Sequence, residues 1–458
     1  MINFARWFFL GILIYAPWAY GCTRLWTINL LNYLLWSCGG ICVVGWLLER
    51  HRPRLPVLPL ACLLLVILQT LWMWFNAHAY YDNSYFQFIL LSPPVPGLPG
   101  SMNKTATLFI LRILIGLAVA FIVTSDLVSD SLWRTRLWTT MGLVGGSIIL
   151  FGLTQRALHA PSIFWLKEDT GITFFGAYRY HANAGAYLNL MWPVLAALTV
   201  EAWQQKDRYV SRAFWMGMLL LGIAACFINI SRGANGITLL LLLPAVFLFL
   251  PFYREHLFLL STRAGFITVS LFVAFILALV LGGSLYQTQY RWERIEHEIN
   301  YDYPRFLVQQ ATARMVPLAG WFGMGAGTFS TMFPYFSGYL GNKIPGYWLY
   351  AHEDYLQAAV EFGYIGAALW SVLLFGGLAQ AARSSFNRHL RTTDRIKCRA
   401  SLLALSGVAL HSLLDFPLQI YSIQLYVMVF LAYIWTRAGT SVRKREHTSS
   451  TYRTREDA

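Results

Sequence analysis

Residues 286–361 read YQTQYRWERIEHEINYDYPRFLVQQATARMVPLAGWFGMGAGTFSTMFPYFSGYLGNKIPGYWLYAHEDYLQAAVE, the longest polar interval in an otherwise apolar chain. Apolar stretches flank this interval on both sides, at 264–285 and 355–381. Each stretch is long enough to cross a bilayer, because a spanning helix needs about 20 apolar residues. We therefore expect residues 286–354 to form one large loop outside the lipid, between two membrane helices.

The composition of the whole chain is typical of a polytopic membrane protein. Of its 458 residues 57% are hydrophobic and only 12% are charged, and the mean hydropathy is +0.50. A soluble domain carries about twice that charged fraction. We expect an all-α fold with a single membrane domain over 1–437 and a basic cytoplasmic tail at 438–458.

The hydrophobic pattern predicts twelve membrane spans. They are expected near 7–21, 28–48, 56–75, 106–125, 137–155, 184–202, 212–230, 235–252, 264–285, 355–381, 399–413 and 420–437. The connection at 76–105 contains SPPVPGLPG, and its prolines predict an irregular structure.

The positions of Lys and Arg predict the orientation of the spans. With the N-terminus inside, 23 of the 35 basic residues fall on the inner side, as expected of cytoplasmic loops. The large loop then faces outward. In this setting the net charge of +14 indicates contact with anionic lipid headgroups, and no nucleic-acid partner is expected.

Two arginines lie close to the outer ends of predicted spans. Arg232 stands in NISRGANG at the junction of the seventh and eighth spans, and Arg112 lies within the fourth span. A charge at this depth usually faces protein or water. Arg232 either points into a cavity or snorkels to the interface. Arg112 is expected to pair with Glu361 or with a phosphate, and we favour the structural pair.

The large loop contains one predicted amphipathic helix, RFLVQQATARMV, with Arg305 at its start and Arg314 nine residues later. For Arg291, Arg294 and Arg314 we favour binding of lipid headgroups. The role of Arg305 is open at this point. The segment GWFGMGAGTF follows, and we interpret it as a turn, because the strand-to-helix context and the GKS ending of a phosphate loop are missing.

The segment AHEDYLQAAVEFGYIG begins the tenth predicted span. Asp354, Gln357 and Glu361 share one helix face, and Glu353 or Asp354 is expected to cap the helix. His352 precedes the helix and can accept a proton from a hydroxyl group; the alternative is a histidine paired with Glu353. An acidic residue such as Glu361 within an apolar span is a functional candidate.

No metal site is predicted. His411 and Asp415 are four residues apart in HSLLDFPLQ, and two ligands favour a structural hydrogen bond over a metal pair. The six cysteines show neither a disulfide framework nor a metal-binding spacing.

These motifs, taken in order, resemble the O-antigen ligase and O-antigen polymerase superfamily of bacterial envelope glycosyltransferases. The resemblance runs roughly from Ser231 to Gln419 and rests on SRG, the arginine in the large loop, GMGAGTF, AHEDYLQAAVEFGYIG and HSLLDFPLQ, with YHANAGAYLNLMWP upstream. PLAGWFG is longer than the spacing usual in the family, and HED replaces the more frequent His-Asn-Asp.

The resemblance implies that two arginines and one histidine form the functional set. By motif position these are Arg232, Arg305 and His352. Further contacts with the substrate are expected from a second group of residues. This group comprises Arg112, Arg314, Gly325, Asp354 and Glu361.

The resemblance also implies an undecaprenyl-pyrophosphate-linked glycan donor and a glycan or lipid A core acceptor. The reaction would take place at the periplasmic face of the bacterial inner membrane. Arginine forks can neutralise the pyrophosphate. The sequence contains no Asp-x-Asp motif, so we expect a metal-independent transfer without a cofactor. Direct displacement of the pyrophosphate by the acceptor would invert the anomeric centre.

Three other functions remain open. A polymerase of lipid-linked repeat units and a protein oligosaccharyltransferase differ from a ligase only in the acceptor. A lipid-linked sugar transporter or flippase would also use intramembrane Arg112 and Glu361. It should show inverted halves and broken helices, whereas the polar residues here concentrate on one outer loop.

Overall fold

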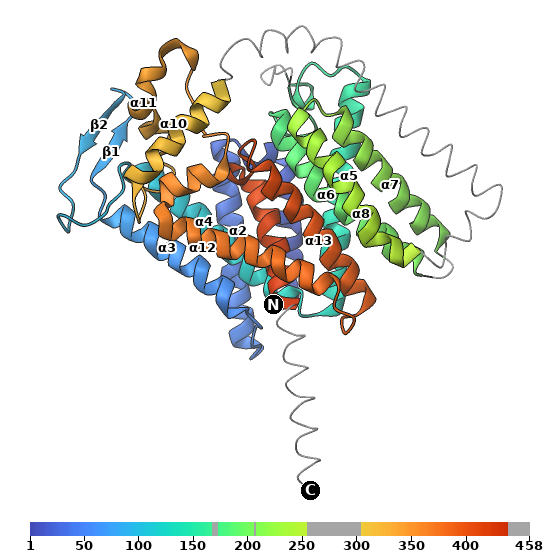
Figure 1. Ribbon diagram of the computed structural model, residues 1–458. Helices are drawn as coiled ribbons and strands as arrows, with labels where there is room; N and C mark the ends of the chain where they lie inside the picture. The colour runs from blue at the N-terminus through green and yellow to red at the C-terminus, as the bar shows by residue number, and fades with distance from the viewer. Residues whose placement is uncertain (167–172, 206–207, 254–303, 438–458) are drawn as a thin grey trace.

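The computed structural model describes residues 1–166, 173–205, 208–253 and 304–437. Within these ranges the protein is a bundle of long helices with a smaller group of elements at one end (Figure 1). Three predicted features lie outside the described residues. They are the ninth span at 264–285, the first part of the large loop at 286–303 with Arg291 and Arg294, and the tail at 438–458.

Eleven of the predicted spans coincide with helices. These are α1 (Ile2–Trp18), α2 (Leu25–Leu48), α3 (Val57–Phe75), α4 (Lys104–Leu127), α5 (Ser131–Ala157), α6 (His181–Trp203), α7 (Tyr209–Ile228), α8 (Arg232–Tyr253), α12 (Asp354–Ser385), α13 (Thr392–His411) and a helix at 421–437. Seven of the described helices are long and apolar enough to cross a membrane, namely α2, α3, α4, α5, α7, α8 and α12. The all-α membrane fold is therefore confirmed, while the total of twelve spans stays a prediction.

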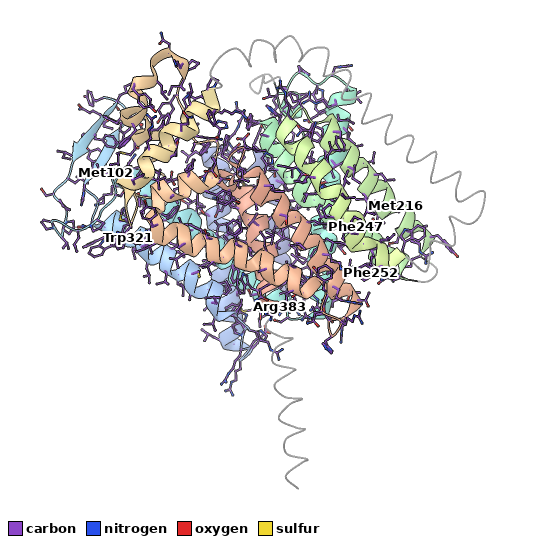
Figure 2. The ribbon with its side chains drawn as sticks, viewed as in Figure 1. Met102, Met216, Phe247, Phe252, Trp321 and Arg383 are labelled. Carbon is purple, nitrogen blue, oxygen red and sulfur yellow. The ribbon has the colours of Figure 1, made fainter. Side chains whose placement is uncertain are left out.

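The outer surface of the bundle is rich in exposed apolar side chains. Phe247 on α8 is 67% exposed and Trp321, beside α12, is 68% exposed; Figure 2 shows both at the sides of the molecule. In water such a surface would be costly, because about 25 cal/mol is gained for each Å² of apolar surface removed from water. Lipid chains provide the apolar surroundings that these residues need.

Helix α6 lies in the interior of the bundle, surrounded by other helices. Nearly all of its residues are buried, and it packs against α5, α7, α8 and α13. Gly185 explains the close approach of α8, because a Cβ atom there would lie 2.3 Å from the Cβ of Ala234. Small residues permit such close contacts between membrane helices. The contact brings the first turns of α6 and α8 together.

The part of the large loop that is described folds into short helices. They are α10 (Pro304–Ala319), α11 (Phe329–Ser337) and the 3-10 helix η5 (Gly338–Lys343). Val308, Met315, Phe329 and Phe333 form the centre of a separate apolar cluster between them. This group lies at the opposite end of the bundle from the N-terminus, at the upper left of Figure 1. The amphipathic helix predicted from Arg305 onward is thus confirmed.

The expectation of an irregular structure over 76–105 is wrong for part of that segment. Strands β1 (Ala79–Asp82) and β2 (Gln87–Leu90) form an antiparallel hairpin with Ala79 opposite Leu90 and Asp82 opposite Gln87. The Asp82 side chain accepts a hydrogen bond from the Ser84 amide at 2.8 Å, which closes the turn. Aromatic and β-branched residues favour strands, and this local preference prevails in the part of the segment that precedes the prolines.

Ion pairs join the helix ends at the other end of the bundle. Asp394, which is fully buried at the start of α13, contacts Arg134 Nε at 3.1 Å and Arg437 Nη2 at 2.6 Å. Arg6 contacts Asp126 at 3.1 Å. Arginines that the charge pattern assigns to the inner side therefore meet acidic partners there, and these contacts tie α5, α13 and the helix at 421–437 together.

Replacing Asp394 with alanine should strongly destabilise the protein, because two nearly buried guanidinium groups would lose their carboxylate. Breaking a buried ion pair from one side costs about 3–5 kcal/mol. The measurement is the thermal unfolding midpoint of the full chain in detergent. Glu49→Ala is the matched control, since its pair with the N-terminal amine is about half exposed and should contribute little. Equal midpoints for the two variants would contradict this prediction.

Candidate functional site

The start of α12 is fastened to a turn at 412–419 by the carboxylate of Asp354. One oxygen of Asp354 accepts hydrogen bonds from Ser412 Oγ and the Leu418 amide, both at 2.9 Å, and the other accepts one from Gln419 Nε2 at 3.0 Å. Glu353 caps the helix by accepting a hydrogen bond from the Leu356 amide, as the sequence predicts. Protein donors thus occupy both oxygens of Asp354, and its position supports an anchoring role.

His352 is held in one orientation immediately before this helix. Its φ of 54° lies in the left-handed region, which is unfavourable for a residue other than glycine. Its carbonyl oxygen accepts a hydrogen bond from Gln309 Nε2 at 2.8 Å, and its Nδ1 lies 2.9 Å from Asp415 Oδ1. The rings of Trp348 and Phe416 lie 5.3 Å and 4.7 Å from the imidazole. These contacts fix the ring and direct Nδ1 toward Asp415.

Arg305 reaches the same carboxylate from the start of α10. Its Nη1 lies 3.7 Å from Asp415 Oδ2, and its Nη2 donates a hydrogen bond to Tyr180 Oη at 2.6 Å. Tyr180 Oη in turn donates to Asp415 Oδ2 at 3.2 Å. Asp415 therefore uses one oxygen for the histidine and the other for the arginine and the tyrosine. The Arg305 side chain is 32% exposed, whereas that of Asp415 is 5% exposed.

The charge of Asp415 is stabilised by these partners. Burial of the side chain, which is 5% exposed, acts to raise the pKa. The hydrogen bond and charge of His352 and the Arg305 guanidinium act in the opposite direction and prevail, so the pKa of Asp415 lies below its usual value. A buried anion next to a fixed cation and an imidazole is an arrangement that can orient a general base.

The expected hydrogen bond between His411 and Asp415 side chains is not found. Helix α13 ends at His411, so the spacing of four residues no longer places the two side chains on one helix face. The Asp415 side chain contacts His352 instead. His411 Nδ1 is buried without a hydrogen-bond partner among the described residues.

Arg232 lies at the same end of the bundle. It is exposed as the first residue of α8, and a Cβ atom on Gly233 would lie 3.7 Å from Leu414, the neighbour of Asp415. Asn229 holds this region against the start of α6 by donating to the His181 carbonyl oxygen at 2.9 Å. The three residues of the predicted functional set therefore occupy one end of the molecule, with Arg305 and His352 joined through Asp415.

Glu361 is hydrogen-bonded to the glycine-rich segment and to its own helix. Its carboxylate accepts hydrogen bonds from the Gly327 amide at 2.9 Å, the Phe329 amide at 3.3 Å and Gln357 Nε2 at 3.1 Å. The favoured pairing with Arg112 is wrong, because Arg112 is exposed on α4 and the described partners of Glu361 are Gly327, Phe329 and Gln357. An ionisable residue within an apolar helix is satisfied here by backbone amides of the glycine-rich segment.

The glycine-rich segment is a tight turn packed against protein. Gly323, Gly325 and Gly327 have φ values of 82°, 110° and 76°, in the region that glycine adopts without strain. A Cβ atom on Gly325 would lie 2.4 Å from Ser101 Oγ, so no room for a ligand exists on that side. The geometry supports the interpretation as a turn and does not place Gly325 beside His352.

Arg314 lies away from the cluster around Asp415. It is exposed on α10, and its guanidinium stacks over the Tyr339 ring at 5.0 Å. Tyr180 and Gln309, which were not among the predicted site residues, do contact the cluster. Tyr180 lies within YRYHANAG, directly before α6, so a signal for it was present in the upstream motif.

Comparison with known proteins supports the predicted family. Residues 217–371 match the family model described as O-antigen ligase. The resemblance to the O-antigen ligase and polymerase superfamily is thereby confirmed over this stretch. It contains Arg232, Arg305 and His352, while Tyr180 and Asp415 lie outside it. No curated protein matches the chain significantly.

The lowered pKa of Asp415 leads to a pH-dependent prediction for Asp415→Asn. A carboxylate whose folded pKa is depressed stabilises the protein fully above its unfolded pKa of about 4, and this stabilisation is lost as the pH falls through the folded pKa. The variant should therefore unfold at a lower temperature than the wild type at neutral pH. The difference should persist down to about pH 5 and narrow below about pH 4.

Thermal melts of both proteins across this pH range provide the measurement. Asp82→Asn, in the hairpin turn, is the control and should leave the unfolding temperature nearly unchanged, because an asparagine can also accept the hydrogen bond from Ser84. A difference for Asp415→Asn that disappears already above pH 5 would argue against a depressed pKa.

Proposed function

We propose, on the premise that residues 217–371 belong to the O-antigen ligase family, that this protein is a membrane glycosyltransferase. It would move a glycan from an undecaprenyl-pyrophosphate carrier to a sugar acceptor at the periplasmic face of the inner membrane. The observation that carries the proposal is the buried Asp415 carboxylate, which joins His352 to Arg305.

The arginines would neutralise the leaving group. When the bond between the anomeric carbon and the pyrophosphate breaks, negative charge grows on the departing oxygen. Arg305 is permanently charged and is held by Tyr180 Oη, so it does not have to be reorganised during the reaction. Arg232 adds a second guanidinium at the N-terminus of α8, where the helix dipole also favours an anion.

His352 would accept the proton of the acceptor hydroxyl. With the proton of the neutral ring on Nδ1 and donated to Asp415, the lone pair of Nε2 is available as a base. The acceptor oxygen then forms a bond with the anomeric carbon while the pyrophosphate leaves from the opposite side. The hydroxyl proton passes to Nε2, and the configuration at the anomeric carbon is inverted. Asp415 stabilises the imidazolium that results.

Charge neutralisation by guanidinium groups makes a metal ion unnecessary in this scheme. Transfer would therefore be metal-independent, and the protein groups named above would carry the whole reaction. The nature of the acceptor is separate from this chemistry, since a ligase, a polymerase and a protein oligosaccharyltransferase present different hydroxyl groups to the same base.

Transport is the less favoured function. A transporter would need ionisable groups inside the membrane that can bind and release a substrate. Glu361 is instead tied to backbone amides of the glycine-rich turn, and Arg112 is exposed on α4. The contacts of Glu361 support a fixed structural role, which fits an enzyme with its reactive residues at one end.

Substitution of the proposed reactive residues should abolish transfer without unfolding the protein. His352→Ala should lower turnover by roughly 10²–10⁴, the usual contribution of a general base. Arg305→Ala and Arg232→Ala should lower it at least as strongly because they remove charge from the leaving-group site. The measurement is transfer by purified protein from a pyrophosphate-linked donor to candidate acceptors.

Arg388→Ala, at an exposed site far from the cluster, is the control and should retain normal activity. EDTA should have no effect on any of the proteins; a sharp loss of activity on chelation would contradict the metal-independent scheme. In a deletion strain, long unattached glycans would identify a ligase, whereas single repeats would identify a polymerase.

Tyr180→Phe should reduce turnover by roughly tenfold, since it removes the hydroxyl that bridges Arg305 and Asp415. The phenyl ring should preserve the stacking on Phe416, whose ring lies 5.6 Å away. Kinetic constants with the same donor test this expectation. Tyr33→Phe, on the exposed face of α2, is the matched control. Unchanged turnover in Tyr180→Phe would show that Arg305 does not need the bridge.

A further inference from the structure

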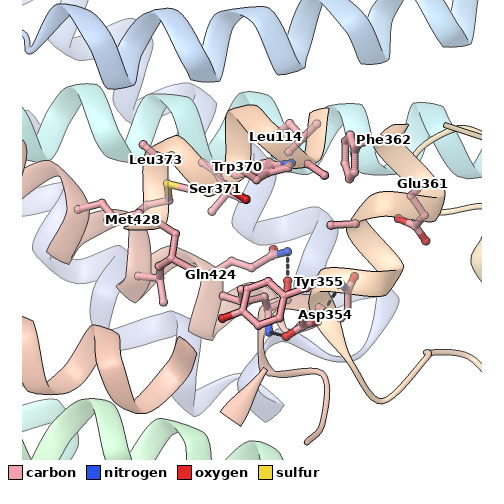
Figure 3. Close-up of a pocket in the computed structure, with 18 of the residues that line it drawn as sticks. Leu114, Asp354, Tyr355, Glu361, Phe362, Trp370, Ser371, Leu373, Gln424 and Met428 are labelled. Carbon is pink, nitrogen blue, oxygen red and sulfur yellow. Dashed lines mark hydrogen bonds between the residues drawn. The ribbon is translucent and has the colours of Figure 1, made fainter. Parts of the chain in front are cut away.

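An apolar cavity of about 270 Å³ lies between α4, α12 and the helix at 421–437. Its wall consists mainly of large apolar side chains. Figure 3 shows Leu114, Trp370, Leu373 and Met428 around the cavity and Glu361 at one end. A cavity of about 150 Å³ accommodates a benzene ring, so this volume fits roughly one or two isoprene units.

The cavity has access to the side of the bundle. Ser371 and Phe375 line it and are both exposed, Phe375 at 47%. Both lie in the middle part of α12, one of the helices that are long and apolar enough to cross a membrane. An opening at this place faces hydrocarbon, so the molecules that can enter from the side are lipid chains.

The polar end of the cavity lies next to the proposed reaction site. Asp354 lines the cavity, and its oxygens hold Ser412 and Leu418. Asp415 lies between these two residues in the same turn, and His352 precedes Asp354 by two positions. The carboxylates of Asp354 and Glu361 are both occupied by protein donors, so this end offers no group that would pair with a cationic head group.

We propose that this cavity holds the first isoprene units of the carrier lipid, an assignment that rests on the proposed function. In a pyrophosphate-linked donor the lipid chain is bonded directly to the pyrophosphate. A site for the chain must therefore lie within a few bonds of the group that Arg305 neutralises. The acyl chains of a lipid acceptor are separated from the accepting hydroxyl by sugars and would lie farther away.

Neighbouring alanines on α12 provide a matched test. Ala367 lines the cavity, whereas Ala368 is exposed and does not. The full-length protein would be assayed with two donors that carry the same glycan pyrophosphate, one with a two-isoprene chain and one with a methyl group in its place. The quantity compared is the ratio of kcat/KM for the two donors.

The wild type should prefer the two-isoprene donor, and Ala367→Phe should reduce this preference roughly tenfold by filling the cavity. Ala368→Phe should leave the preference unchanged. Ser371→Trp and Val372→Trp form a second pair of the same design, since Val372 is exposed and does not line the cavity. The assignment is wrong if the donor preference changes equally in both variants of a pair. It is also wrong if Ala367→Phe and Ser371→Trp lower kcat/KM equally for the two donors.

A binding experiment separates this inference from the proposed function. A two-isoprene pyrophosphate with a photoreactive group on its first unit should label α12 or the helix at 421–437 near Trp370 and Met428, and the labelling should fall in Ala367→Phe. Labelling elsewhere, or equal labelling by a fatty-acyl probe, would overturn the assignment. If the wild type transfers glycan from neither donor while this labelling is seen, the proposed function fails and the lipid site stands.

Discussion

The site depends on one buried anion, Asp415. A carboxylate out of contact with water is costly unless it is paired and hydrogen-bonded. Asp415 meets this condition through His352, Arg305, Tyr180 and the amide of Phe416. These partners come from four segments that are distant in the sequence, so the need to satisfy a single carboxylate brings together the start of α6, the start of α10, the residue before α12 and the turn after α13.

The first turns of α12 form the framework around this anion. Glu353 caps the helix, Asp354 holds the turn at 412–419, and Glu361 binds the amides of the glycine-rich segment. Three acidic residues near one end of an apolar helix are thus explained by backbone and side-chain donors that would otherwise be unsatisfied in a nonpolar region. The contacts of Asp354 hold the start of α12, directly after His352, against the turn that carries Asp415.

The helix bundle connects this end of the molecule with the lipid. The lateral cavity beside α12 ends at Asp354, the residue that also anchors the turn carrying Asp415. At the other end, Asp394 gathers Arg134 and Arg437 into a buried network. The bundle therefore carries charged clusters at its two ends and mainly apolar side chains between them, which suits a bilayer.

The sequence alone predicted the helices and the family resemblance, which are confirmed, and it named Arg232, Arg305 and His352 as the reactive residues, which stay a proposal. Runs of about 20 apolar residues allow little else than a spanning helix, because backbone groups in lipid must be satisfied within the helix itself. Helix α10 and the cap of α12 were likewise predictable, since amphipathic spacing and capping act over a few residues. The hairpin at 79–90 was not predicted, because the prolines at 93–99 are typical of irregular structure and the two strands have only four residues each.

Only the tertiary structure decided which polar groups meet. Asp415 pairs with His352 instead of His411, and Glu361 binds the glycine-rich turn instead of Arg112. Tyr180 joins Arg305 across 125 positions of sequence. Such contacts depend on how distant helices pack, and the motif in which a residue stands does not specify its partner. The physical reason is range: helix formation is determined by neighbours along the chain, whereas the pairing of buried charges is determined by neighbours in space.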